Sequence, residues 1–204
     1  MYLIDKIPVF PSSYVEIELE CLYFLRTSFP ENTHKASILD VLSLEDHLFG
    51  YKLGIDDNLE RSNIEGYTDF LGKAFYVPLK TYDALVRGYN NNRERFTATH
   101  EAGHIILHRK LFENKSMIAA RAFKGEIEHY KDPEWQANAA AASLLMPLPS
   151  FYREYKKLSS VGRSYFSIIQ SLATKFQVST DTVSIRIKTL SNKGIKDLIA
   201  QLGL

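Results

Sequence analysis

Residues 93–111 read RERFTATHEAGHIILHRKL, and this stretch predicts one long helix that carries a chemical motif. The segment contains no proline and follows three asparagines at 90–92, a residue type that is preferred at helix N-caps. Positions 96, 100, 103, 104, 107 and 111 follow the i, i+3, i+4 spacing of one helix face, and Ile105 and Ile106 add apolar surface elsewhere. We therefore expect a helix that begins near Arg93 and is buried on most sides.

Inside this helix, His100, Glu101 and His104 form an H-E-x-x-H motif. Two histidines four residues apart lie on one helix face, so both imidazoles can bind one zinc ion, with Glu101 as general base. This pattern is typical of zinc-dependent hydrolases, and the competing interpretation is accidental spacing. Gly103 weakens a helix by about 1 kcal/mol relative to alanine. A glycine here predicts that another backbone approaches the helix closely beside the metal, and the alternative is a glycine that is merely tolerated.

A catalytic zinc site needs a third protein ligand and leaves its fourth position to water. His108 continues the histidine series, but it lies about 12 Å from His100 along a straight helix axis, which is too far for a shared metal. The favoured third ligand is Glu134, ahead of Glu126 and Glu128, although an acid at the start of a helix is also favoured by the helix dipole.

Other polar residues have predicted supporting roles around these ligands. Asn138 lies one turn after Glu134 and can orient a ligand histidine, and His108 is expected in the core or behind a ligand. His129 and Tyr130 are candidate donors to the oxyanion, although either can simply be a surface residue.

Two segments resemble a known family. Residues 96–108, FTATHEAGHIILH, look like the F-T-x-A-H-E-x-G-H-x-x-L-H signature of the ImmA/IrrE family of metallo-endopeptidases. Residues 134–147, EWQANAAAASLLMP, resemble that family's E-x-x-A-N-x-F-A-x-x-L-L-M-P segment. The departures are Thr99 in place of the usual alanine, Ala102 where leucine is common and Ala140 where phenylalanine is common.

The resemblance implies that His100, His104 and Glu134 bind the metal, with Glu134 as a gluzincin-like third ligand and Glu101 as general base. The implied metal is zinc, with manganese or another divalent ion as alternatives. The implied substrate is a Cro-type helix-turn-helix repressor, whose cleavage releases mobile-element or stress genes. The expected fold is α+β: a mostly helical zincin-like peptidase core with a small antiparallel sheet, followed by a helix-turn-helix-like C-terminal region.

The first half of the chain predicts this core only in outline. Helices are expected over residues 14–27 and 38–49, and strands over 51–55 and 73–79, with turn residues at 54–58. The strand over 73–79 can hold an extended substrate if it lies at the sheet edge, or it can simply pack in the core.

Residues 150–204 carry nine basic residues against three acidic ones, and we expect a domain boundary between 1–149 and 150–204. Residues 171–190 predict a helix, a short turn and a second helix capped by Ser179. In a DNA-binding helix-turn-helix, Ser184, Arg186 and Lys188 would lie near the major groove. The alternative is a structural pair of helices with a solvated basic face.

Composition excludes several classes of protein. The hydrophobic content of 45% and charged content of 24% are ordinary for a globular protein. Cys21 is the only cysteine, so no disulfide can form within the chain. The N-terminal residues lack a signal-peptide pattern and no stretch is apolar enough for a membrane span, so we expect a cytoplasmic protein without a membrane partner.

Two classes of function fit these features. The first is a site-specific metallo-endopeptidase. The second is a non-catalytic regulatory module that binds a repressor or DNA and retains a vestigial metal site. The sequence favours the enzyme, because Glu101 has no use in a structural site and no Cys or His at ligand spacing offers a fourth structural ligand.

Overall fold

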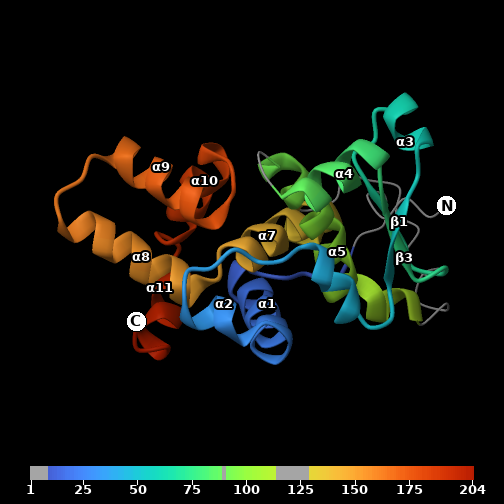
Figure 1. The fold of residues 1–204 in the computed structure, drawn as a ribbon. Coiled ribbons are helices and arrows are strands. Elements are labelled where there is room, and N and C mark those ends of the chain that lie inside the picture. Colours follow the sequence, from blue (N-terminus) through green and yellow to red (C-terminus); the bar gives the residue numbers. More distant parts are fainter. Residues whose placement is uncertain (1–8, 89–90, 114–128) are drawn as a thin grey trace. The chain divides into compact units, whose positions relative to one another are not determined.

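In the computed structural model, the described residues are 9–88, 91–113 and 129–204, apart from the side chain of His129 (Figure 1). They form two compact units: unit 1 comprises Met1–Ser13 and Asp40–Ala141, and unit 2 comprises Tyr14–Leu39 and Ala142–Leu204. Unit 1 contains η2 (Leu42–Asp46), β1 (Lys52–Ile55), α3 (Asn58–Arg61), β2 (Tyr67–Asp69), β3 (Ala74–Val77), α4 (Leu79–Arg87), α5 (Asn92–Glu113), η3 (His129–Lys131) and most of α7 (Pro133–Leu145). Unit 2 contains α1 (Tyr14–Ser28), α2 (Pro30–His34), α8 (Leu148–Ser160), α9 (Tyr165–Phe176), α10 (Thr180–Thr189) and α11 (Lys193–Gln201).

The fold is α+β and mostly helical, as the sequence predicted, and its units interleave along the chain because residues 14–39 group with the C-terminal helices. The domain boundary expected between residues 149 and 150 stays a prediction. In the part of the chain that the structure describes, no helix is long and apolar enough to cross a membrane.

The three-stranded sheet of unit 1 is mixed, so the prediction of an antiparallel sheet was only partly right. Its strand order is β1-β3-β2, with β1 parallel and β2 antiparallel to β3. The sequence-based prediction missed β2, which is only three residues long. Because β2 reverses the chain between the two predicted strands, those two run in the same direction.

The turn from β2 to β3 is built by Asp69, whose Oδ1 accepts hydrogen bonds from the backbone N–H groups of Leu71 and Gly72. This hairpin places β3 in the centre of the sheet. Of the two roles left open for residues 73–79, an edge strand for substrate is excluded in the described sheet, because both edges of β3 are already paired. The edge strand β2 contacts α5 through Thr68.

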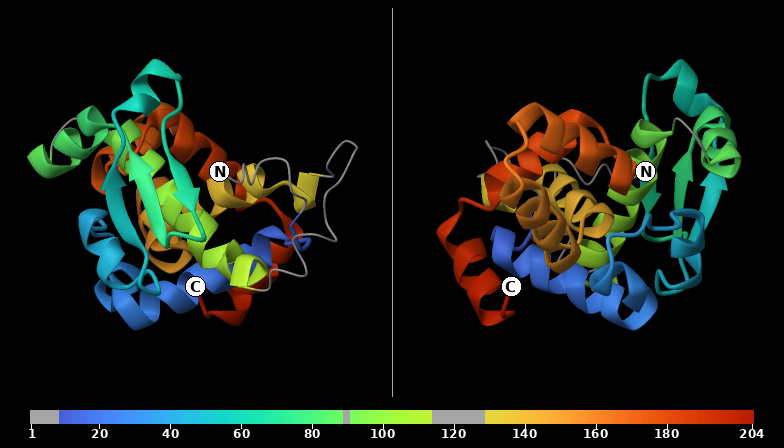
Figure 2. Two further views of the ribbon diagram at one scale, coloured as in Figure 1. Left: turned by 90° about the vertical axis from the view of Figure 1, so that its right-hand side faces the viewer. Right: turned by 60° about the vertical axis from the view of Figure 1, so that its left-hand side comes forward.

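Helix α5 starts at Asn92, one residue before the predicted start, and packs against β2 and β3 and beside α4 (Figure 2, left). Most of its residues between Arg95 and Phe112 are buried, as expected for a helix surrounded by core. A Cβ atom at Gly103 would lie 3.1 Å from the carbonyl oxygen of Ala137 and 3.1 Å from the Cβ of Ala140. The predicted close approach of another backbone is thus confirmed, and α7 provides it.

The prediction of a helix over residues 38–49 was largely wrong. Only a 3-10 helix, η2, forms in this segment. Phe49 and Gly50 have φ angles of 56° and 83°, and this left-handed backbone ends helical structure. By contrast, α1 matches its predicted range closely, since it stops just before the Phe29-Pro30 pair, where proline disfavours helical backbone in the preceding residue.

In unit 2, α9 and α10 form the predicted helix, turn and helix. Gln177 has a φ of 49° and ends α9, and the side chain of Ser179 caps α10 by accepting the N–H of Thr182. Arg186, however, does not face solvent: it is only 3% exposed. The expectation that Arg186 can reach a DNA groove is therefore wrong, whereas the exposed side chain of Lys188 remains accessible.

Arg186 instead forms a buried ion pair with Glu18 of α1, at 2.8 Å, and Glu18 is 1% exposed. The guanidinium also donates to the carbonyl of Met146. Glu18 accepts hydrogen bonds from the hydroxyl of Ser143 at 2.7 Å and the N–H of Leu148 at 3.1 Å. These bonds join α1, α10 and the segment from α7 to α8, so the pair organises the interior of unit 2.

We predict that Arg186→Met lowers the free energy of unfolding by about 3–5 kcal/mol, because it leaves Glu18 charged and unpaired in the interior. Urea denaturation followed by circular dichroism measures this change. The matched control is Lys188→Met on the exposed side of α10, which should change stability by no more than about 0.5 kcal/mol. Equal effects of the two substitutions would show that the buried pair has no special role.

Candidate metal site

Three side chains of unit 1 converge at one point: His100 and His104 from α5 and Glu134 from the first turn of α7. The Nε2 atoms of the two histidines are 3.0 Å apart. His100 Nε2 lies 3.1 Å from Glu134 Oε2, and His104 Nε2 lies 3.2 Å from Glu134 Oε1. Among the described residues, this cluster has the composition and spacing to hold a metal ion.

These separations fit a tetrahedral metal. Ligand atoms about 2.0–2.1 Å from a zinc ion at tetrahedral angles lie about 3.3 Å from one another. Two imidazole nitrogens and a carboxylate that face one another at 3.0–3.2 Å concentrate negative potential between them. A cation at this point compensates the negative potential. The donor set therefore fits a divalent metal with two nitrogen ligands and one oxygen ligand.

A chain of hydrogen bonds behind His104 fixes which of its nitrogens faces the cluster. The amide nitrogen of Gln136 donates to the carbonyls of Phe10 and Tyr130, both at 2.8 Å. Its Oε1 must therefore be the acceptor that lies 3.0 Å from His108 Nε2. His108 then carries its proton on Nε2 and accepts through Nδ1 from His104 Nδ1, at 3.2 Å. The Nε2 lone pair of His104 is consequently left for a metal.

His100 is oriented in the same way by Asn138, whose Oδ1 lies 3.1 Å from His100 Nδ1. The structure thus brings Asn138 and His108 behind the two histidines, where the sequence analysis expected supporting residues. It also brings in Gln136, which the sequence analysis missed. Gln136 lies between Glu134 and Asn138 on α7, but its partners His108 and Phe10 are far away in sequence, so no local pattern reveals it.

The charges of these groups follow from their surroundings. Burial and the neighbouring His104 lower the pKa of His108 to about 3, so His108 is neutral at pH 7. Burial alone raises the pKa of Glu134, but hydrogen bonds with His100 and His104 outweigh it and hold this pKa well below its usual range. Burial alone lowers the pKa of His100, yet its hydrogen bond to the Glu134 carboxylate and the charge of Glu101 raise it overall. The site therefore favours positive charge at Nε2 of His100, which a metal ion supplies.

Glu101 lies beside the cluster and is 5% exposed. Its Oε2 accepts a hydrogen bond from the hydroxyl of Thr68 on β2, at 2.7 Å. On its other side, a Cβ atom at Gly66 would come within 3.0 Å of Glu101 Oε1, so only glycine leaves this oxygen uncrowded. Thr68 and Gly66 were not predicted from the sequence, because they belong to a strand and a loop that pair with α5 only in the folded chain.

Of the other residues predicted to act at the site, the structure describes the side chain of Tyr130. Tyr130 is 45% exposed, its carbonyl accepts from Gln136, and its ring lies 5.4 Å from the ammonium of Lys131. Its role as an oxyanion donor stays a prediction. The side chain of His129, and the acids at positions 126 and 128, lie outside the described residues.

Comparison with known proteins gives an independent view of this site. The family model of the IrrE N-terminal-like domain, peptidase family M78, matches residues 87–188, which include all three converging side chains. Among solved structures, the chain is similar in fold to a Mycobacterium tuberculosis transcriptional regulator, with a TM-score of 0.54 and 19% identity. The similarity covers 89% of this chain and 54% of that one, so the chain spans about half the regulator's length. No curated protein matches the chain.

We predict that Gln136→Leu weakens zinc binding by about 10- to 100-fold, the usual size for loss of a group that orients a ligand histidine. Without Gln136, nothing fixes which ring nitrogen of His108 carries the proton, and the tautomer of His104 is then no longer fixed either. Competition with a chelating dye measures the affinity. Gln170→Leu, the same substitution at an exposed position of α9, is the control and should leave affinity unchanged. An unchanged affinity in Gln136→Leu would mean that His108 orients His104 without help.

Proposed function

This chain belongs to the IrrE N-terminal-like family of peptidases, as its motifs predicted, and from this premise we propose that it is a metal-dependent endopeptidase. The observation that carries the proposal is the convergence of His100, His104 and Glu134 beside the buried carboxylate of Glu101. A structural metal site has no need of such a carboxylate, whereas hydrolysis requires a general base.

The three converging side chains would hold the metal, and zinc is the ion that their donor set fits best. When bound, zinc supplies Lewis acidity that lowers the pKa of water from 15.7 toward about 7 and polarises a carbonyl. Among the described residues, no fourth His, Cys, Asp or Glu joins the cluster, which leaves room for water and substrate.

Glu101 performs the proton transfers. Its carboxylate takes a proton from the attacking water as the water oxygen bonds to the scissile carbonyl carbon. It then gives that proton to the amine nitrogen as the carbon–nitrogen bond breaks, so that a carboxyl and an amine terminus result. Thr68 holds Oε2 of Glu101, and Gly66 leaves the opposite oxygen, Oε1, uncrowded, so that Oε1 would carry the proton.

Strand β2 is the best-placed element to hold the substrate. It is an edge strand of the described sheet and its Thr68 contacts Glu101. An extended peptide that pairs with the outer edge of β2 would bring its backbone to the general base. This role replaces the one expected for the central strand β3.

For the substrate we propose a helix-turn-helix transcriptional repressor. The support is the resemblance of residues 96–108 and 134–147 to repressor-cleaving peptidases, together with the fold shared with a transcriptional regulator. The second candidate function, a regulatory module without catalysis, is supported by the observed helix-turn-helix of α9 and α10. It is weakened by the burial of Arg186.

The deciding experiment incubates the zinc-loaded chain with the helix-turn-helix repressor encoded next to its gene, and mass spectrometry maps any cut. We predict that Glu101→Gln lowers kcat by about 100- to 10,000-fold, the range of general acid–base catalysis, and that a chelator abolishes cleavage. Glu113→Gln removes the same charge at the far end of α5 and should retain activity. Specific DNA binding without any metal-dependent cut would instead support the regulatory module.

Thr68 provides a finer test of the catalytic geometry. We predict that Thr68→Val lowers kcat about tenfold, because Glu101 loses a hydrogen bond to a charged group worth about 1.5 kcal/mol. Thr68→Ser keeps the hydroxyl and should restore most of the rate. KM and zinc affinity should remain close to wild type in both variants. A loss that serine does not restore would indicate a packing role for the threonine methyl group.

A further inference from the structure

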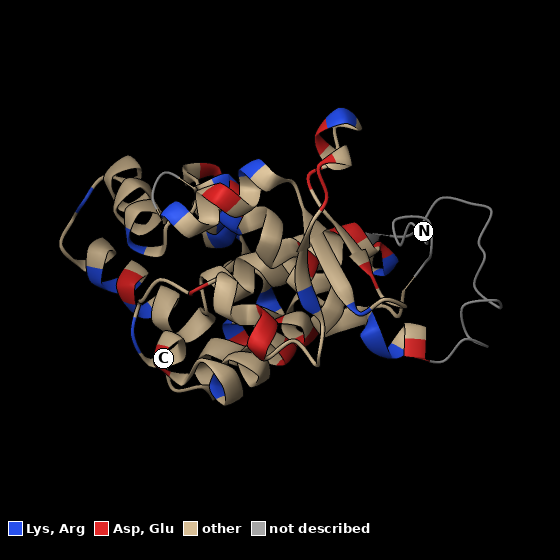
Figure 3. Cartoon of the chain, turned by 45° about the vertical axis from the view of Figure 1, so that its right-hand side comes forward, with Lys and Arg blue, Asp and Glu red and all other residues tan. Residues whose placement is uncertain are grey.

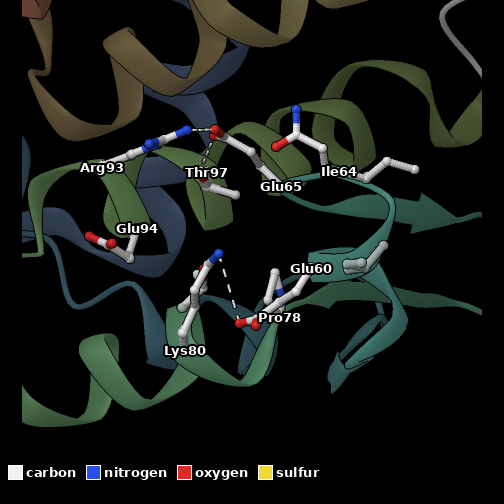
Figure 4. A pocket seen from close by; sticks show the side chains of 11 residues that line it. Glu60, Ile64, Glu65, Pro78, Lys80, Arg93, Glu94 and Thr97 are labelled. Atoms are coloured by element: carbon white, nitrogen blue, oxygen red, sulfur yellow. Dashed lines mark hydrogen bonds and ion pairs between the residues drawn. The ribbon is translucent and has the colours of Figure 1, made fainter.

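A small polar cavity of unit 1 opens between α5, the start of α4 and the loop before β2 (Figure 4). Its volume is about 180 Å³. Pockets that enclose whole small-molecule ligands are larger, about 300–1,000 Å³. The cavity therefore has the size for one amino-acid side chain rather than for a cofactor.

The cavity lies next to the proposed catalytic base. Thr97 lines it and precedes Glu101 by four residues, one helical turn or about 6 Å along α5. Glu65, which also lines it, accepts a hydrogen bond from Thr97 at 3.3 Å. The next residue, Gly66, lies against the carboxylate of Glu101. A side chain in this cavity would thus belong to a residue close to the bond that Glu101 acts on.

Uncharged residues form the base of the cavity. Leu59, Pro78 and Thr81 line it and are buried. Such a surface can cover the aliphatic stem of a long side chain, while any charged end of that side chain remains at the rim.

The rim carries an excess of negative charge. Lys80 and Glu60 form an ion pair at 3.8 Å, and Arg93 pairs with Glu65 on the opposite side (Figure 4). Both cations are therefore already compensated by a carboxylate. The fifth charged residue of the lining, Glu94, is partly buried, and no described residue forms an ion pair with it.

We propose that this cavity is a specificity subsite for a lysine or arginine side chain of the substrate, next to the scissile bond. This inference rests on the proposed peptidase function. The aliphatic stem lies against Leu59 and Pro78, and the cationic end pairs with Glu94. A repressor is a suitable source of such residues, because proteins that bind DNA carry Lys and Arg on their binding surface.

The cleavage test uses the zinc-loaded full chain and a randomised peptide mixture, with cut sites mapped by mass spectrometry. Lysine and arginine should be enriched at one position next to the cut. For a matched pair of peptides with Lys or Gln at that position, Glu94→Gln should reduce the Lys-over-Gln ratio of kcat/KM by about twofold to fivefold, the size of a partly exposed ion pair. Glu94→Lys should favour the Gln peptide.

Glu113→Gln is the matched control, since it removes a carboxylate about 28 Å away along α5 and should leave the ratio unchanged. Equal cleavage of peptides with Lys, Gln or Glu at every position next to the cut would overturn the subsite. So would a Glu94→Gln variant that keeps the wild-type ratio.

A binding test separates failure of the subsite from failure of the proposed function. Nuclear magnetic resonance follows the amide signals of Leu59, Thr81 and Thr97 while Nα-acetyl-lysine methylamide is added to the zinc-loaded chain. These signals should shift with the lysine compound and not with its glutamate counterpart. If no peptide is cut, the peptidase proposal fails, and this titration alone decides the cavity: equal or absent shifts with the two compounds overturn it.

Discussion

One electrostatic constraint orders the residues around the candidate site of unit 1: two imidazole nitrogens and a carboxylate face one another at 3.0–3.2 Å. Such an arrangement is unfavourable without a positive charge between the groups. Nδ1 of His100 donates to Asn138, Nδ1 of His104 donates to His108, and these two hydrogen bonds hold both imidazoles in this orientation. The fold therefore holds these groups in a geometry that favours binding of a cation. Because a metal would bind only the folded arrangement, its binding free energy would add to the free energy of unfolding of the part that contains α5 and α7.

This constraint also explains why α5 and α7 approach so closely. Glu134 can reach the histidines only if the first turns of α7 lie against the middle of α5. Gly103 permits this approach, because any side chain there would meet the backbone of Ala137, and Ala140 keeps the opposing surface small. The alanine at position 140, where the resembled motif commonly has phenylalanine, matches the narrow space that faces Gly103.

The sequence predicted features that depend on residues close together in the chain. The extent of α5, the cap at Ser179 and the pairing of Asn138 with His100 follow from helical spacing or local capping, and all three are observed. Features that depend on distant contacts were missed. Gln136 acts through Phe10 and His108, and β2 is recognisable only by its pairing with β3.

The same distinction bears on the C-terminal charge. Nine basic residues in 150–204 suggest a surface for DNA, but a basic residue contributes to such a surface only if its side chain is exposed and not paired with a carboxylate. Arg186 is neutralised inside unit 2 by Glu18, and Lys175 pairs with Glu154 at 2.9 Å. The remaining bases of this region lie on α8, α10 and α11 and at Arg163. Figure 3 shows Lys and Arg scattered over many parts of the chain. Because phosphate binding scales with the number of free cations on one face, the burial of Arg186 removes one of the three side chains that were expected near a major groove.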